Sequence, residues 1–179
     1  PEAVVCEFLP ERVPDDFADL PIPFSTVAAD YYGAAEVEIG AGSLRRAVAA
    51  SIALPALFRP VEIGGLTLID GGVVNPLPFD KLPDDIEMIV AVDVVGMPVR
   101  SDKGRLPGAR EALFGSSQIL MQALISEKLK SRQPDVLIRP PIDGIGVLDF
   151  TKAKDILEAT ACVREEVKAA VGRRLDAAA

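Results

Sequence analysis

The strongest structural signals in the chain lie in residues 46–78, which read RAVAASIALPALFRPVEIGGLTLIDGGVVNPLP. Just before them stands Ser43, a residue type that caps helices because its hydroxyl accepts a bond from a free backbone N–H. We therefore expect a short helix from Leu44 to about Ala53. Pro55 ends this helix, since proline has no N–H to donate and its ring clashes with the preceding turn.

The second half of this stretch predicts a hairpin that ends on an acid. Residues 61–69 alternate between apolar and polar side chains around Gly64–Gly65, a pair that tolerates the positive φ of a tight turn. The second arm leads directly into Asp70, and Gly71–Gly72 follow it. An acid at the end of an apolar strand, next to two residues without side chains, is held rigidly with its oxygens uncovered. This arrangement is typical of a functional site.

Elsewhere, strands and helices are expected to alternate in the second half of the chain, as in a layered α/β domain. A nearly continuous apolar run at residues 86–95 predicts a strand buried on both faces in a parallel sheet. We also expect an irregular connector over 1–23 and further strands at 24–29, 36–39 and 136–139. A helix is expected at 109–132, with a leucine face packed on the sheet. A final helix should be capped by Asp149 or Thr151.

Several short motifs together make the sequence resemble the second half of the patatin-like phospholipase family, in its bacterial soluble branch. They are a Ser-x-Ala-Leu-Pro helix end, a Phe-x-Pro, the Asp-Gly-Gly and an Asn-Pro, at Ala50, Ser51, Pro55, Phe58, Pro60, Asp70, Gly71, Gly72, Asn75 and Pro76. Weaker similarity continues through residues 23–30 and 135–140. The resemblance thus covers nearly the whole chain.

The resemblance implies a three-layer α/β/α sandwich. Residues 1–179 would be the C-terminal portion of a single patatin-like domain whose N-terminal part is missing from this chain. It also implies a serine acyl hydrolase of the phospholipase or lysophospholipase type, which cleaves lipid acyl esters through a serine–aspartate dyad. Asp70 would be the catalytic base, and Gly71, Gly72 and Asn75 would shape the site. No metal and no organic cofactor are implied.

The nucleophile of such a dyad is absent from this sequence. The family places it in a Gly-x-Ser-x-Gly turn, which residues 40–44 and 115–119 approach but do not match. The chain also has no histidine, so a Ser-His-Asp triad is ruled out within it. We therefore expect the serine upstream of Pro1 and no activity from these residues alone. The alternative function is a non-catalytic interaction or scaffold module that lacks the nucleophile half.

Composition limits the partners. The net charge of −8 argues against nucleic acid, which needs a basic surface. No apolar run reaches the roughly 18 residues of a membrane-spanning helix, so we expect a soluble, cytoplasmic protein whose membrane contact is peripheral. Cys6 and Cys162 are interpreted as reduced, buried thiols. The expected partners are a lipid or acyl ester substrate, and either the missing N-terminal half or a second copy of the chain.

Three further acids, Asp30, Asp93 and Asp143, lie at or near the ends of predicted strands. Turns and caps account for most acids in such places. Asp93 stands out because it interrupts an apolar strand, and we interpret it as a structural hydrogen-bond hub.

Overall fold

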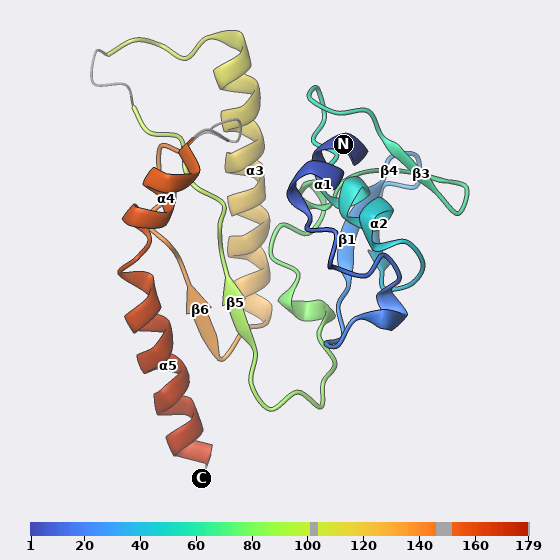
Figure 1. The fold of residues 1–179 in the computed structure, drawn as a ribbon. Helices are drawn as coiled ribbons and strands as arrows, with labels where there is room; N and C mark the ends of the chain where they lie inside the picture. Colours follow the sequence, from blue (N-terminus) through green and yellow to red (C-terminus); the bar gives the residue numbers. More distant parts are fainter. Residues whose placement is uncertain (101–103, 146–151, 179) are drawn as a thin grey trace. The chain divides into compact units, whose positions relative to one another are not determined.

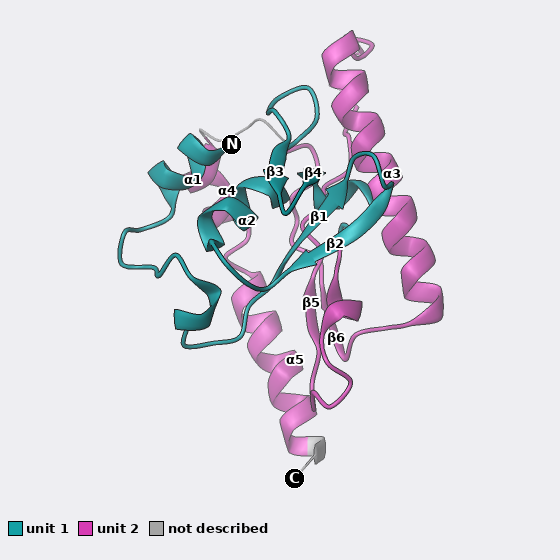
Figure 2. Ribbon diagram, turned by 90° about the vertical axis from the view of Figure 1, so that its right-hand side faces the viewer, with its two compact units in different colours: residues 1–76 teal, residues 77–179 magenta. Residues whose placement is uncertain are grey.

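The structure, a computed structural model, describes residues 1–100, 104–145 and 152–178 (Figure 1). The chain divides into two compact units, residues 1–76 and 77–179 (Figure 2). Each unit combines helices with a small sheet, so the chain belongs to the mixed α/β class that the sequence predicts. The predicted helix cap at Asp149 or Thr151 lies outside the described residues.

The first unit is built on a four-stranded antiparallel sheet with the order β2-β1-β4-β3. Its strands are β1 (Thr26–Asp30), β2 (Ala35–Ile39), β3 (Val61–Ile63) and β4 (Leu66–Asp70). Its helical elements are α1 (Glu2–Phe8), α2 (Leu44–Ser51) and the 3₁₀ turns η1 (Phe17–Asp19) and η2 (Gly71–Val73). Because β4 lies between β1 and β3, the strand that ends in Asp70 is held from both sides.

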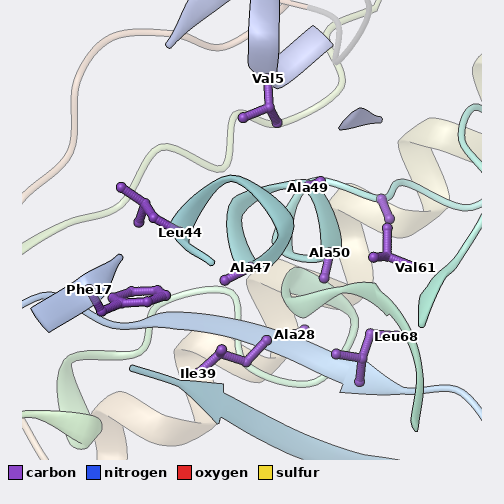
Figure 3. Close-up of a cluster of buried hydrophobic side chains, with 11 residues drawn as sticks. Val5, Phe17, Ala28, Ile39, Leu44, Ala47, Ala49, Ala50, Val61 and Leu68 are labelled. Atoms are coloured by element: carbon purple, nitrogen blue, oxygen red, sulfur yellow. The ribbon is translucent and has the colours of Figure 1, made fainter. Parts of the chain in front are cut away.

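The predicted helix after Ser43 is confirmed as α2. Ser43 Oγ accepts a hydrogen bond from Arg46 N at 3.3 Å, and Asp15 Oδ1 accepts one from Arg45 N at 2.9 Å. The buried positions of α2 are mostly alanines, whose small side chains let the helix approach the sheet closely. The core of this unit (Figure 3) consists of Val5, Phe17, Ala28, Ile39, Leu44, Ala47, Ala49, Ala50, Ala53, Val61 and Leu68.

The predicted hairpin is also confirmed. β3 and β4 pair in antiparallel register from Val61 with Leu68 to Ile63 with Leu66. Gly64 and Gly65 connect the two strands with φ values of 58° and 81°. Two consecutive positive φ angles match the twist of the flanking strands, and only glycine adopts them without strain.

The prediction that residues 1–23 form an irregular connector is wrong, because this segment contains α1 and η1. Val5 of α1 and Phe17 of η1 are both buried in the core of the first unit. Asp16 caps η1 by accepting a bond from Ala18 N at 2.9 Å. Burial of these apolar side chains therefore overrides the loop preference of the surrounding prolines and acids.

The second unit contains a two-stranded parallel sheet, β5 (Val90–Val92) and β6 (Val136–Ile138). Its helical elements are η3 (Phe79–Lys81), α3 (Ala109–Ser131), α4 (Ala153–Ala159) and α5 (Val163–Ala178). The two strands are parallel, as predicted, but the prediction that β5 is buried on both faces is wrong. Ala91 packs against Ile125 of α3, whereas Val90 and Val92 are 38% and 47% exposed. A single covering helix buries alternate residues only.

α3 matches the helix predicted over residues 109–132, yet the predicted leucine face is not the buried one. Leu113, Leu120 and Leu124 are exposed, and Gln118 and Ile125 are buried instead. A hydrogen bond from Gln122 to the backbone oxygen of Val95, at 2.6 Å, helps to turn this face toward β5.

The single final helix of the prediction is in fact two helices, α4 and α5. The chain leaves the helical path at residues 160–162, where Thr160 Oγ1 donates back to Ile156 O at 2.8 Å. A threonine hydroxyl that bonds one turn back competes with continuation of the helix.

Candidate active site

Asp70 is the last residue of β4 and lies opposite Ala28 of β1. Its backbone N–H donates to the carbonyl oxygen of Ala53, just after α2, at 3.1 Å. Its carboxylate Oδ1 accepts a hydrogen bond from Gly72 N at 2.7 Å and so caps η2. The neighbouring strand, the end of α2 and the following turn therefore all fix the orientation of this side chain.

Position 71 requires glycine because the backbone there lies against the backbone of β1, and not because of its φ angle. A Cβ built at this position would lie 2.2 Å from the carbonyl oxygen of Val27 and 2.6 Å from its carbonyl carbon. No side chain fits there unless β1 moves. The turn after Asp70 consequently lies directly against β1, and this contact holds the Gly72 N–H in place under the carboxylate.

Burial raises the pKa of Asp70, and the hydrogen bond from Gly72 N only partly opposes this shift. Burial disfavours the charged form of a carboxyl group, which makes the carboxylate a stronger base. Over the described part of the chain, Gly72 N is the one group that donates to this carboxylate, and it donates to Oδ1. Oδ2 is thus left for a proton donor from elsewhere.

Asn75 joins the turn after Asp70 to the opposite edge of the sheet. Its side chain is 4% exposed, and its Nδ2 donates to Glu36 Oε2 of β2 at 3.0 Å. Its backbone N–H donates to Gly71 O at 2.8 Å, which closes the turn. Asp70, Gly71, Gly72 and Asn75, the four residues singled out in the sequence, therefore lie in one connected turn.

Four serines within the described ranges, Ser43, Ser51, Ser116 and Ser117, have positions that do not serve Asp70. Ser43 caps α2, and Ser51 is the last residue of that helix. Ser116 and Ser117 both donate their hydroxyls to Leu113 O within α3. None of them forms a hydrogen bond with Asp70.

Asp93 has the geometry of a hydrogen-bond hub in the second unit. Its buried carboxylate accepts from Gln122 Nε2 at 3.2 and 3.3 Å, from Arg139 Nε at 3.2 Å and from Val95 N at 3.1 Å. Asp30 and Asp143 hold turns, through bonds from Tyr32 N and Met97 N. A cation and two other donors therefore occupy the Asp93 carboxylate, whereas Gly72 N alone donates to that of Asp70 within the described residues.

Sequence reasoning located Asp70 but missed three features of its surroundings. These are the Gly71 approach to β1, the bond from Asp70 N to Ala53 O, and the pairing of Asn75 with Glu36. The run of two glycines after a strand was the only signal for the first. The other two join residues far apart in the chain and leave no local pattern.

Over the described ranges, the structure brings together no group of three or more side chains suited to holding a metal ion. Within the same ranges, none of the helices has the length and apolar character needed to cross a bilayer. Cys6 and Cys162 are free thiols, but both are exposed, so the prediction that they are buried is wrong.

Comparison with known proteins agrees with the resemblance read from the motifs. The profile of the patatin-like phospholipase family matches residues 4–83, which include the whole turn around Asp70. An uncharacterized NTE family protein of Mycobacterium tuberculosis is 32% identical over 161 residues, an alignment that covers 78% of this chain. The chain belongs to the patatin-like phospholipase family.

Two other relatives extend this comparison. A second uncharacterized NTE family protein of M. tuberculosis is 37% identical over 78 residues, which is 43% of this patatin-like chain. Lysophospholipase NTE1 of Debaryomyces hansenii is 27% identical over 133 residues, or 62% of the chain. The patatin-like chain spans only 22% and 28% of the two mycobacterial relatives and 9% of the Debaryomyces protein.

Proposed function

We propose that this chain supplies the general base of a serine acyl hydrolase that cleaves lipid acyl esters, of the phospholipase or lysophospholipase type. Membership of the patatin-like family supports a lipid hydrolase, and one relative is named a lysophospholipase. In this proposal Asp70 is the base, and the nucleophilic serine lies outside the 179 residues. We further propose that both units belong to one catalytic domain. The alignment to the 32%-identical relative supports this, because it covers 78% of the chain, more than either unit alone.

The proposal depends on two properties of the Asp70 carboxylate, its raised pKa and its fixed orientation. Burial raises its pKa, and Gly72 N holds Oδ1 at 2.7 Å. A serine hydroxyl is a weak nucleophile and needs a base within about 2.6–3.2 Å. A base works best when its pKa lies close to the operating pH, and ordinary aspartate lies well below it. Partial burial at the end of β4 shifts Asp70 in the useful direction.

The proposed reaction has two steps. As the serine oxygen bonds to the ester carbonyl carbon, its proton passes to Oδ2 of Asp70. The carbon–oxygen bond to the leaving alcohol then breaks, and the alkoxide takes that proton. In the second step water attacks the acyl-serine, Asp70 again accepts a proton, and the serine oxygen receives it as the fatty acid leaves. No metal and no organic cofactor enters either step.

The turn after Asp70 has a positioning role in this mechanism. Gly72 N binds Oδ1 and so directs Oδ2 toward the incoming hydroxyl. Gly71 allows that geometry by lying against Val27 O. Asn75 holds the turn to β2 through Glu36. Free thiols at Cys6 and Cys162 suit a reducing compartment, and we propose a cytoplasmic location.

The first test uses the 179-residue chain itself. With a base and no nucleophile, it should not hydrolyse a p-nitrophenyl acyl ester and should not be labelled by a serine-reactive fluorophosphonate. The protein extended upstream in its own coding sequence should do both. Labelling of the short chain would place the nucleophile among its own serines. An extended protein with no activity would favour the scaffold alternative.

A further inference from the structure

Both tyrosines of the chain lie side by side in the turn between β1 and β2. Tyr31 is 60% exposed and Tyr32 is 81% exposed. Their rings meet edge to face, with centroids 5.1 Å apart and an interplanar angle of 88°. Leu66, at the start of β4, is a further exposed apolar side chain. Large aromatic side chains are usually more buried than this, so we interpret the exposed pair as a candidate binding surface.

Hydrogen bonds fix the backbone of the turn that carries the two tyrosines. Tyr32 N donates to Oδ1 of Asp30 at 3.2 Å, and Tyr31 N donates to Thr67 O of β4 at 2.8 Å. Gly33 lies so close to Asp30 that a Cβ there would be 2.3 Å from Oδ2. A turn fixed at both ends presents its side chains in the free protein and loses little conformational entropy on binding.

The acidic residues of the two neighbouring hairpins indicate which type of lipid the tyrosines would bind. The two hairpins, residues 26–39 and 61–70, contain no lysine and no arginine. Their charged residues are all acidic: Asp30, Glu36, Glu38, Glu62 and Asp70. An acidic surface repels anionic lipid. Aromatic faces beside acids attract a quaternary ammonium group, and tyrosine favours the headgroup level of a bilayer.

We propose that Tyr31 and Tyr32 form the contact of this protein with a zwitterionic lipid surface, with their rings among choline headgroups. This inference rests on the proposed lipid-hydrolase function. Tyr31 is bonded to Thr67, three residues before Asp70 along β4. Three residues of strand span about 10 Å, so the neighbouring hairpin, which ends in the base, lies close to this lipid contact.

The amino-acid composition provides a direct probe of this contact. The chain has two tyrosines and no tryptophan, so its tyrosine emission arises only from Tyr31 and Tyr32. The 179-residue chain is titrated with phosphatidylcholine vesicles that carry either ordinary headgroups or headgroups with a nitroxide spin label. We expect it to bind both and its emission to be quenched selectively by the spin-labelled lipid. Phosphatidylglycerol vesicles should bind at least several-fold more weakly.

Variants separate this contact from other exposed apolar residues. Changing Tyr31→Ser and Tyr32→Ser together should weaken co-sedimentation with phosphatidylcholine vesicles by roughly tenfold, because both aromatic contacts are lost. Phe8→Ser is the matched control, because Phe8 is 75% exposed in the same unit but lies on α1. Circular dichroism checks that both variants keep the wild-type helix and strand content.

Three results would overturn the proposal: no binding to phosphatidylcholine vesicles, binding without selective quenching, or equal loss in Phe8→Ser. A change of tyrosine emission with protein concentration in the absence of lipid would instead assign the turn to self-association. Vesicle binding requires no turnover, so it is measured on the 179-residue chain, which we expect to be inactive. The experiments can therefore refute the lipid contact without refuting the proposed hydrolase function, and the reverse.

Discussion

The backbone N–H of Gly72 donates to Oδ1 of Asp70 across 2.7 Å, while burial of the same carboxyl raises its pKa. These two effects oppose each other, and burial is the larger. Together they give a carboxylate that is fixed in direction and more basic than an exposed aspartate.

Replacing Asp70 by asparagine should change how stability depends on pH. A raised pKa means that the folded chain holds the proton more tightly than the unfolded chain. The carboxyl group therefore stabilises the fold below the unfolded pKa, and this contribution is lost as pH rises through the folded pKa. Asp70→Asn should melt higher than wild type at about pH 7.5, with the difference vanishing below about pH 4. A lower Tm than wild type at pH 7.5 would contradict this.

Gly71→Ala should be strongly destabilising, because its Cβ would lie 2.2 Å from a backbone oxygen of β1. We expect a loss of about 2–4 kcal/mol in the free energy of unfolding, measured by urea denaturation. Gly40→Ala is the control within the same unit, since its Cβ would meet its nearest neighbour at 3.7 Å, an ordinary contact. Equal stability of the two variants would show that β1 can move away from the turn.

Asn75→Asp should place a second carboxylate against Glu36, where Nδ2 now donates at 3.0 Å. Glu36 is half-buried and position 75 is buried, so two acids at that distance cannot both be charged without a large cost. The variant should therefore lose stability, and more at pH 8 than at pH 5. Adding Glu36→Gln should restore much of the loss, because the glutamine amide can donate to the new aspartate. Failure of this rescue would show that the pair does not hold the turn.

β5 should make the isolated chain associate. Over the described residues it pairs with β6 alone, and Val90, Val92 and Val94 are exposed beside its open edge. Exposed apolar strands with free edges drive association. Light scattering should therefore show a mass that rises with concentration. Lysine at positions 90 and 92 should suppress this rise, whereas Leu106→Lys, at an exposed residue outside the strands, should not.

Local signals predicted local structure well in this chain. The capping hydroxyl of Ser43, the Gly64–Gly65 turn and the helical spacing of α3 each depend on a few neighbouring residues, and each was found. The errors come from tertiary packing. α1 forms because Val5 reaches a core built from later residues, and α3 turns a glutamine face inward because Asp93 and Val95 accept its hydrogen bonds.

In the candidate site, too, local patterns could be predicted from the sequence and contacts between distant residues could not. Asp70 could be predicted because an acid that ends an apolar strand before two glycines is a local pattern. The partner of Asn75 could not be, since Glu36 precedes it by 39 positions on another strand. The exposure of both tyrosine rings follows from the packing of the whole unit and leaves no local pattern in the sequence.

The account depends most directly on the kcat of Asp70→Asn, measured in the protein extended upstream to include the nucleophile, with a short-chain ester as substrate. Asparagine can still accept the bond from Gly72 N but cannot take the serine proton. We predict a fall in kcat of roughly 10²–10⁴, with the fold retained by circular dichroism and Tm. Asp85→Asn, at an exposed loop residue, should keep wild-type kcat. A folded Asp70→Asn variant that turns over within about threefold of wild type would contradict the assignment of Asp70 as the base.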